Sequence, residues 1–191
     1  MILNAAHTIE HIETTVNALE RICKKYHVTG DNEDLLASVC IREVLEEMIK
    51  SAFIRAVRSN KPIVLSMVAV DHFAEINDKF SRKTGDRVIK EISSFIKSSI
   101  RGTDIVCRSA IAEFALLLIN SAASDTEILC DRIAQKVRDH NWSEIAEGLN
   151  VTISIGLTDL ENNNTAIDML EKALTNLSQA KQSGGNQVIA D

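Results

Sequence analysis

Residues 62–71 read Pro-Ile-Val-Leu-Ser-Met-Val-Ala-Val-Asp, and this stretch decides the fold. It is a nearly continuous apolar run, rich in β-branched residues, that ends at a carboxylate. Such a run is typical of a central strand that is buried on both faces. Because other elements must then cover both faces, the stretch predicts a layered α/β domain.

Helical and strand patterns surround this central strand. Apolar residues recur at helical spacing over 34–57 before it and over 88–100 after it. Two strand patterns follow, 104–109 and 113–119, and the very short turn between them predicts a hairpin.

The last third of the chain continues the alternation of helix and strand. Ser124 and Glu127 predict a capping box ahead of a helix. A strand, a helix stopped by a glycine pair and a short final strand are predicted over 151–158, 165–183 and 187–190. We therefore expect an α/β fold with a mixed central sheet and helices on both faces.

Composition narrows the class of protein. The chain has 191 residues, 45% of them apolar, and a formal charge of −6, which suits one domain with an appendage. No basic stripe with interleaved aromatics suggests a nucleic-acid partner. The sequence shows neither a signal-peptide pattern nor a membrane-length apolar run, so we expect a cytoplasmic location. Its cysteines are widely spaced within apolar patterns and are predicted to be reduced core thiols: Cys23, Cys40, Cys107 and Cys130.

A separate pattern occupies the first residues. Apolar side chains recur there at heptad spacing: Ile2, Ala5, Ile9, Ile12, Val16, Leu19, Cys23 and Tyr26. This narrow seam predicts an N-terminal helix over 1–28, ahead of a domain over 29–191. Two interpretations stay open: the helix pairs as a coiled coil in a homodimer, or it folds back on its own domain.

Motifs spread over 34–190 resemble those of one family. The stretch 70–78, VDHFAEIND, is similar to D-I-D-H-F-K-x-I-N-D, and 180–186, AKQSGGN, is similar to A-K-x-x-G-R-N. A G-D pair, an S-I-G strand and an opening motif D-x-L-T-G-L-x-N-R have counterparts at 85–86, 153–156 and 34–42. In this order and spacing they make the chain resemble the GGDEF, or diguanylate cyclase, domain of bacterial signal transduction. The resemblance implies a nucleotidyl-cyclase-like fold.

The resemblance departs from the family at the hairpin, where R-Y-G-G-(D/E)-E-F appears as 108–114, RSAIAEF. In the family the two glycines let the backbone approach the GTP phosphates, whereas Ala110 and Ile111 carry side chains. Ala69 and Ala112 stand where the family has metal-binding carboxylates, which leaves Glu113 alone. Mg²⁺ needs near-octahedral oxygen coordination, which one carboxylate cannot supply well.

A phosphate-contacting arginine of the family is also replaced, by Gly185. The resemblance therefore implies an inactive cyclase homologue with no catalytic residues, metal or cofactor. Asn77 and Asp86 match the family's guanine-reading pair. We favour the alternative that Asn77 caps a turn and Asp86 caps the helix that follows.

The family's inhibitory motif R-x-x-D is retained as Arg101-Gly102-Thr103-Asp104, at the family's spacing from the hairpin. Arg132 lies in a D-R-I sequence similar to the family's E-R-I. The resemblance implies that Arg101, Asp104 and Arg132 bind cyclic di-GMP. An arginine can donate to guanine O6 and N7, and a carboxylate can accept from guanine N–H groups. The alternative is that Arg101 and Asp104 are surface residues at a helix end, where arginine is favourable.

The motifs therefore leave two alternative functions. The first is a non-catalytic cyclic di-GMP receptor that acts through a homodimer or a protein partner of unknown identity. The second is a ligand-independent interaction or dimerisation module built on an inactive cyclase fold. An active cyclase is the least supported of the functions that we consider.

Overall fold

The strand predicted over 62–71 is β1 (Ile63–Val70), and it lies at the centre of a five-stranded sheet with the order β2-β3-β1-β4-β5. The computed structural model describes residues 42–191. The predicted N-terminal helix, its heptad seam and most of the opening motif therefore lie outside the described residues. Every residue of β1 is buried, as its apolar run predicts.

The other strands extend the sheet on both sides of β1. The predicted hairpin is formed by β2 (Ile105–Ala110) and β3 (Glu113–Ile119), and β3 pairs antiparallel with β1. On the other side β4 (Ile153–Asp159) pairs antiparallel with β1 and parallel with β5 (Val188–Ile189). The expected mixed sheet is confirmed.

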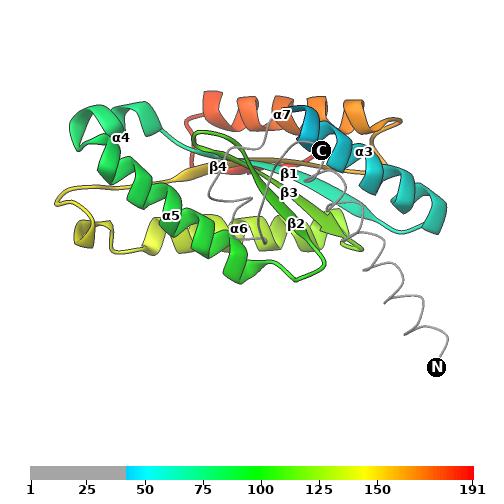
Figure 1. Ribbon diagram of the computed structural model, residues 1–191, viewed down its shortest axis with the longest axis horizontal. Coiled ribbons are helices and arrows are strands. Elements are labelled where there is room, and N and C mark those ends of the chain that lie inside the picture. The colour runs from blue at the N-terminus through cyan, green and yellow to red at the C-terminus, as the bar shows by residue number, and fades with distance from the viewer. Residues whose placement is uncertain (1–41) are drawn as a thin grey trace.

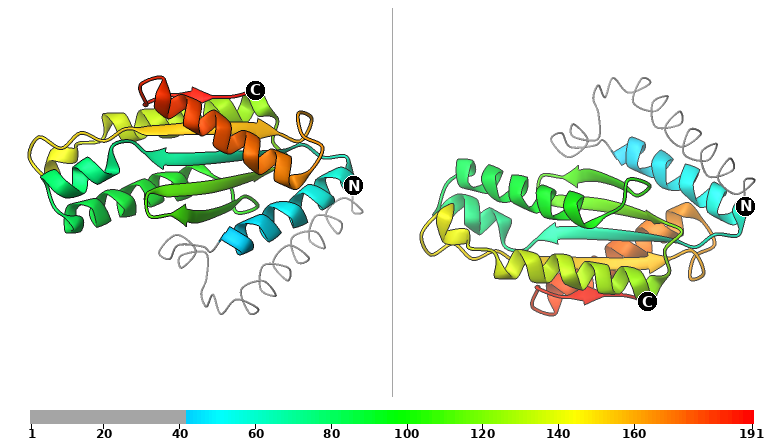
Figure 2. Two further views of the ribbon diagram at one scale, coloured as in Figure 1. Left: turned by 90° about the horizontal axis from the view of Figure 1, so that it is seen from above. Right: turned by 90° about the horizontal axis from the view of Figure 1, so that it is seen from below.

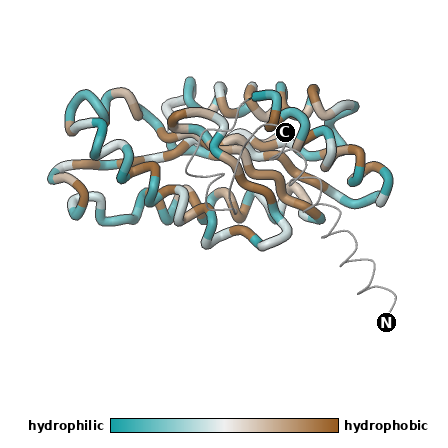
Figure 3. The backbone as a smooth tube through the Cα atoms, viewed as in Figure 1, coloured by the Kyte–Doolittle hydropathy of each residue, from teal (hydrophilic) through white to brown (hydrophobic). Residues whose placement is uncertain are grey.

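Helices cover both faces of the sheet, as expected. Figure 1 shows α3 (Arg42–Ser59) and α7 (Ala166–Gln182) on one side and α5 (Arg82–Ser99) and α6 (Ala123–Asp139) on the other. Each pair of helices packs on its own face of the strands and forms a separate apolar cluster. The hydropathy colouring in Figure 3 places the most apolar backbone in the strands between these layers. Burial of an aliphatic side chain contributes about 1.5–3 kcal/mol, so the two clusters stabilise most of the fold.

One helix was missed, and two local expectations about capping residues were wrong here. The helix α4 (Phe73–Lys79) was not predicted, because its single buried residue, Ile76, gives no helical periodicity. The capping box is absent, since α6 begins before Ser124 and its N-cap, Ala122, makes no side-chain bond. Asp86 lies inside α5 and does not cap it, because Ser81 accepts from the Thr84 amide at 3.2 Å as its N-cap.

Elements from distant parts of the sequence meet at one end of the sheet, which we call the hairpin end. There the end of β1, the β2–β3 turn and the C-terminal end of α7 converge. The Val70 amide donates to the Ala112 carbonyl at 2.9 Å, and the Asn186 amide donates to Asp71 at 2.9 Å.

Within 42–191 no helix is long and apolar enough to cross a membrane.

Candidate ligand-binding sites

The carboxylate that follows β1, on Asp71, is buried and ties three segments together. It accepts from Thr152 Oγ1 at 2.7 Å and from Ser154 Oγ at 2.6 Å. Its Oδ2 also accepts from the Asn186 amide at 2.9 Å. All these partners are donors from the protein itself, so Asp71 holds β1, β4 and the 184–187 loop in place.

Glu113, at the start of β3, is paired with a lysine. Its Oε1 lies 2.8 Å from Nζ of Lys181 on α7, and both side chains are partly exposed. The residue opposite Glu113 in the β1–β3 register is Ala69, which is buried and carries no ligand atom. The sequence motif singled out Glu113, but it did not predict the ion pair between Glu113 and Lys181.

These residues do not fit the Mg²⁺ that the family resemblance implies. Magnesium takes several oxygen ligands, and Ala69 and Ala112 offer no side-chain oxygen. The remaining carboxylate, on Glu113, already has a cationic partner. Among residues 42–191 no three histidine, cysteine or acidic side chains gather as a metal-binding group.

The turn between β2 and β3 is closed by an arginine and does not require glycine. Nε of Arg108 donates to the Ile111 carbonyl at 3.0 Å, and its Nη2 donates to the same oxygen. Neither Ile111 nor Ala112 has a positive φ. A register shift between Arg108 and Ala110 supplies the turn's geometry as a bulge, so residues with side chains fit this turn.

Burial lowers the pKa of Arg108, and the charge of Asp86 on α5 partly opposes that shift.

Asp86 and Asn77 match the family's guanine-reading pair. Asn77 lies within α4 and so does not cap a turn, contrary to expectation. A Cβ at Gly85 would lie 2.0 Å from Asn77 Oδ1, so glycine there allows α4 and α5 to approach each other. The structure thus places Asn77 against the turn of α5 that carries Asp86.

The R-x-x-D turn connects α5 to β2 and is held by its own aspartate. Oδ2 of Asp104 accepts from the Arg101 amide at 2.9 Å, and its Oδ1 accepts from the Ile119 amide at 3.2 Å. These bonds fix the shape of the turn and attach it to the end of β3. A carboxylate has about four acceptor sites, so both oxygens of Asp104 keep the capacity to accept from a ligand.

The two arginines of the predicted site lie on α6 and just after α5, and these two helices pack side by side. The rings of Phe95 on α5 and His140 on α6 lie 5.1 Å apart, and further along α5 Ser98 accepts from Lys136 Nζ at 3.2 Å. Contacts thus move toward the start of α6 as they move toward the end of α5. Arg101 lies in the turn that follows α5, and Arg132 lies on α6 one turn before Lys136. Both arginines are exposed, and within 42–191 neither side chain has a hydrogen-bond or ion-pair partner.

The mixed sheet, the β2–β3 hairpin and the turn before it define an α/β domain with two candidate sites at opposite ends of β2. The family model described as "Diguanylate cyclase, GGDEF domain" matches residues 32–187. The chain belongs to the GGDEF domain family.

Two curated bacterial proteins are similar to the chain in sequence. Diguanylate cyclase A of Treponema denticola is 34% identical over 126 residues, which is 64% of this chain and 33% of that protein. The response regulator PleD of Caulobacter vibrioides is 31% identical over 160 residues, 82% of this chain and 35% of that protein. The chain spans about a quarter to a half of the length of the curated relatives that it matches.

Solved structures share the fold. The coiled coil and GGDEF domain of DgcB from Caulobacter crescentus, in complex with c-di-GMP, matches with a TM-score of 0.76 at 23% identity. That match covers 99% of this chain and 98% of the other. The diguanylate cyclase SiaD of Pseudomonas aeruginosa, in complex with its activator SiaC, matches at 25% identity with a TM-score of 0.73. It covers all of this chain and 72% of that one.

Proposed function

We propose that this domain binds cyclic di-GMP without making it, as a non-catalytic receptor. The observation that carries the proposal is that two arginines are exposed and without a protein partner among residues 42–191: Arg101, in the R-x-x-D turn after α5, and Arg132, on the neighbouring helix α6. Exposed guanidinium groups favour a ligand that carries negative charge and hydrogen-bond acceptors. Cyclic di-GMP offers both, through its phosphates and its guanine O6 and N7 atoms.

The absence of catalysis is supported by the residues at the hairpin end. Ala69 and Ala112 offer no metal ligand, and Lys181 neutralises Glu113. Without a metal, the attacking hydroxyl and the developing charge of phosphoryl transfer have no electrostatic support. We therefore expect the domain to be a degenerate member of its family.

A ligand-independent docking module is the second candidate. It is favoured by Asp104, whose two oxygens already serve the backbone, and by Ile111, which is 68% exposed at the tip of the hairpin. In this alternative the R-x-x-D turn only connects α5 to β2 and binds no ligand, and the hairpin tip contacts another protein. Measurement of ligand binding separates the two candidates.

The test is titration calorimetry of the full chain with cyclic di-GMP, with GTP as the comparison ligand. We expect binding of cyclic di-GMP by the unaltered chain. Hydrogen bonds to charged groups contribute about 1.5–3 kcal/mol, so Arg101→Ala or Arg132→Ala should weaken binding by about ten- to a hundred-fold. Asp104→Ala should act similarly.

Two matched controls accompany these variants. Arg82→Ala removes an exposed arginine at the far end of α5, and Asn77→Ala alters the hairpin end. Neither should change the affinity for cyclic di-GMP. If the unaltered chain shows no binding at high micromolar ligand, the receptor proposal is wrong and the docking module replaces it.

A further inference from the structure

The outer face of α5 carries a row of basic side chains, which we call the α5 stripe: Lys83, Arg87, Lys90 and Lys97. They follow one another at intervals of four, three and seven positions, which keeps them on a single face of a helix. All four residues are exposed. The buried side of the helix, which includes Ile92, lies opposite the stripe and packs into the core. The stripe therefore faces away from the sheet.

The α5 stripe is long and belongs to a regular helix. α5 has 18 residues, and at 1.5 Å per residue the stripe spans about 21 Å from Lys83 to Lys97. Figure 2 shows α5 along the same face of the sheet as α6. Nη1 of Arg87 donates to the Ile145 carbonyl at 3.2 Å, which attaches the stripe to the loop after α6 and leaves the charge of Arg87 without a counter-charge. The stripe thus presents a fixed row with nearly one cation per helical turn.

The acidic residues of α5 do not neutralise the stripe. Asp86 and Glu91 lie four positions from Lys90 and Arg87, a spacing at which ion pairs can form on a helix. Among residues 42–191 neither pair makes such a contact. Asp86 acts on another element: burial lowers the pKa of Arg108 on β2, and the charge of Asp86 opposes that shift. The cations of the stripe therefore keep their charge for another molecule.

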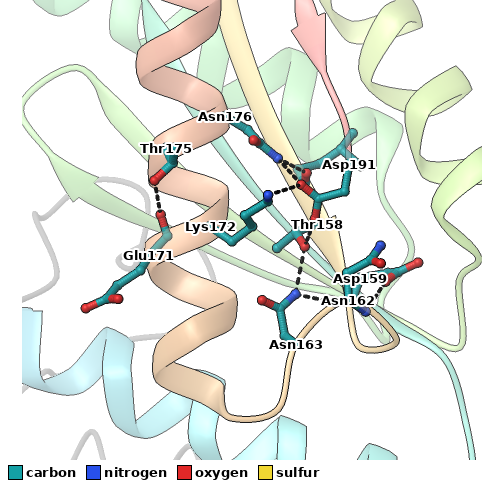
Figure 4. A network of polar contacts seen from close by, with 10 residues as sticks. Thr158, Asp159, Asn162, Asn163, Glu171, Lys172, Thr175, Asn176 and Asp191 are labelled. Carbon is teal, nitrogen blue, oxygen red and sulfur yellow. Dashed lines mark hydrogen bonds and ion pairs between the residues drawn. The ribbon is translucent and has the colours of Figure 1, made fainter.

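The lysines of α7, on the other face of the sheet, show the opposite behaviour. Lys172 Nζ lies 3.4 Å from Oδ1 of Asp191, within the polar network that Figure 4 shows. Lys181 Nζ lies 2.8 Å from Oε1 of Glu113. Both lysines of this helix are thus paired with carboxylates of the same chain, and each pair connects α7 to a neighbouring segment.

Lys83 and Lys90 differ from these lysines, because within the described part of the chain neither has a hydrogen-bond or ion-pair partner. α5 carries five basic and two acidic side chains, although the formal charge of the whole chain is −6. A surplus of positive charge is therefore concentrated on one helix of an acidic protein. Such a patch attracts partners of the opposite charge.

The surroundings of the stripe narrow the chemistry of that partner. None of the large apolar side chains that are exposed within 42–191 lies on α5, so this helix lacks the apolar face that enters a bilayer surface. A nucleic acid would extend beyond the stripe over a chain of charge −6, which repels its phosphates. A short acidic helix meets the stripe alone, and carboxylates at heptad spacing would face its basic side chains turn by turn.

We propose that the α5 stripe binds an acidic α-helix of a partner protein. The partner helix carries Asp or Glu at heptad spacing on the face that contacts α5. This inference is independent of cyclic di-GMP binding, because the stripe includes none of Arg101, Asp104 and Arg132.

Amide NMR titration of the full chain with a synthetic acidic helix tests the stripe. The probe is an alanine-based peptide of about three heptads with glutamate at the a and d positions. Exposed ion pairs are weak, so we expect a dissociation constant of about a millimolar at low salt, with shifts centred on the stripe. A peptide of the same composition, with its glutamates spread around the helix, should bind about five-fold more weakly, since fewer pairs can form at once.

Two double variants place the binding on α5. Lys83→Glu with Lys90→Glu should weaken binding of the acidic peptide by about ten-fold, because two attractive contacts become repulsive. Lys50→Glu with Lys61→Glu reverses two exposed lysines outside α5 and is the matched control, which should change the affinity by less than about two-fold. The α5 variant should keep the affinity of the unaltered chain for cyclic di-GMP, so the two proposals are tested separately.

Equal weakening by the two double variants, equal binding of the two peptides or shifts away from α5 would overturn the proposal. Absence of shifts at several millimolar peptide would overturn it as well. A DNA duplex of about 20 base pairs and vesicles that contain phosphatidylserine are the comparison ligands. If either binds the stripe more tightly than the peptide and loses that binding in the α5 variant, the acidic helix is the wrong partner.

Discussion

The hairpin end and the R-x-x-D turn lie at opposite ends of β2, and they differ in what happens to their charged groups. At the hairpin end three charged side chains have partners in the protein: Asp71 accepts from three donors, Glu113 pairs with Lys181, and Arg108 donates to the turn. At the R-x-x-D turn only Asp104 is so engaged, while Arg101 and Arg132 face solvent.

This difference separates charges that hold the fold from charges that are free to bind a ligand. A buried carboxylate surrounded by protein donors stabilises the elements that supply them, and its removal leaves those donors unsatisfied. An exposed arginine contributes little to stability and keeps its donors for another molecule. On our proposal the hairpin end has become structural, whereas the turn keeps a binding role.

The largest expected effect tests the structural half of this comparison. Asp71→Ala should lower the free energy of unfolding by about 3–5 kcal/mol, because three donors lose a charged acceptor in a buried place. Urea denaturation measures it. Asp78→Ala, which removes an exposed acid from α4, should change the stability by less than about 0.5 kcal/mol. Equal effects of the two variants would show that Asp71 does not hold the hairpin end.

A smaller effect is expected at Gly185, next to Asp71. Its φ is +74°, and a Cβ there would lie 3.1 Å from the Asp71 carboxylate. Gly185→Ala should therefore cost about 1–2 kcal/mol, from left-handed strain and crowding. Ala substitution at Gly102, whose φ is not positive and whose Cβ would meet open space, is the control for thermal unfolding measurements. A cost at Gly185 no larger than at Gly102 would mean that the loop rearranges freely.

The smallest effect is expected from restoring the family hairpin. Ala110→Gly, Ile111→Gly and Ala112→Asp together should give no cyclic di-GMP from GTP with Mg²⁺ or Mn²⁺, because Ala69 and Gly185 still lack the family's ligands. Chromatography of the reaction measures the product against a blank without protein. Turnover by the unaltered chain would refute the degenerate assignment, and turnover by the triple variant alone would show that the hairpin is the sole defect.

The fold was largely predictable from the sequence, because its periodicities reflect burial. The apolar run at 62–71 predicted β1, and the paired patterns around 110–112 predicted the hairpin. The helix α4 escaped prediction because one buried residue makes no period, and the capping box failed because α6 begins one residue before Ser124. Local signals of this kind mark boundaries less reliably than long apolar patterns do.

The candidate sites were predictable only as residue types. The motifs singled out Arg101, Asp104, Arg132 and Glu113. The sequence could not show that Glu113 is paired with Lys181, 68 positions away, because such a pair depends on how α7 packs on the sheet.

The sequence by itself determined the succession of strands and long helices along the chain, since side-chain burial repeats every two residues in strands and every 3.6 in helices. Only the tertiary structure decided which charges have partners. The donors that surround Asp71 and Asp191 come from residues far apart in the chain, and their approach depends on the packing of β4 and α7. Sequence periodicity records which face of an element is buried, but it carries no information on which distant polar groups meet there.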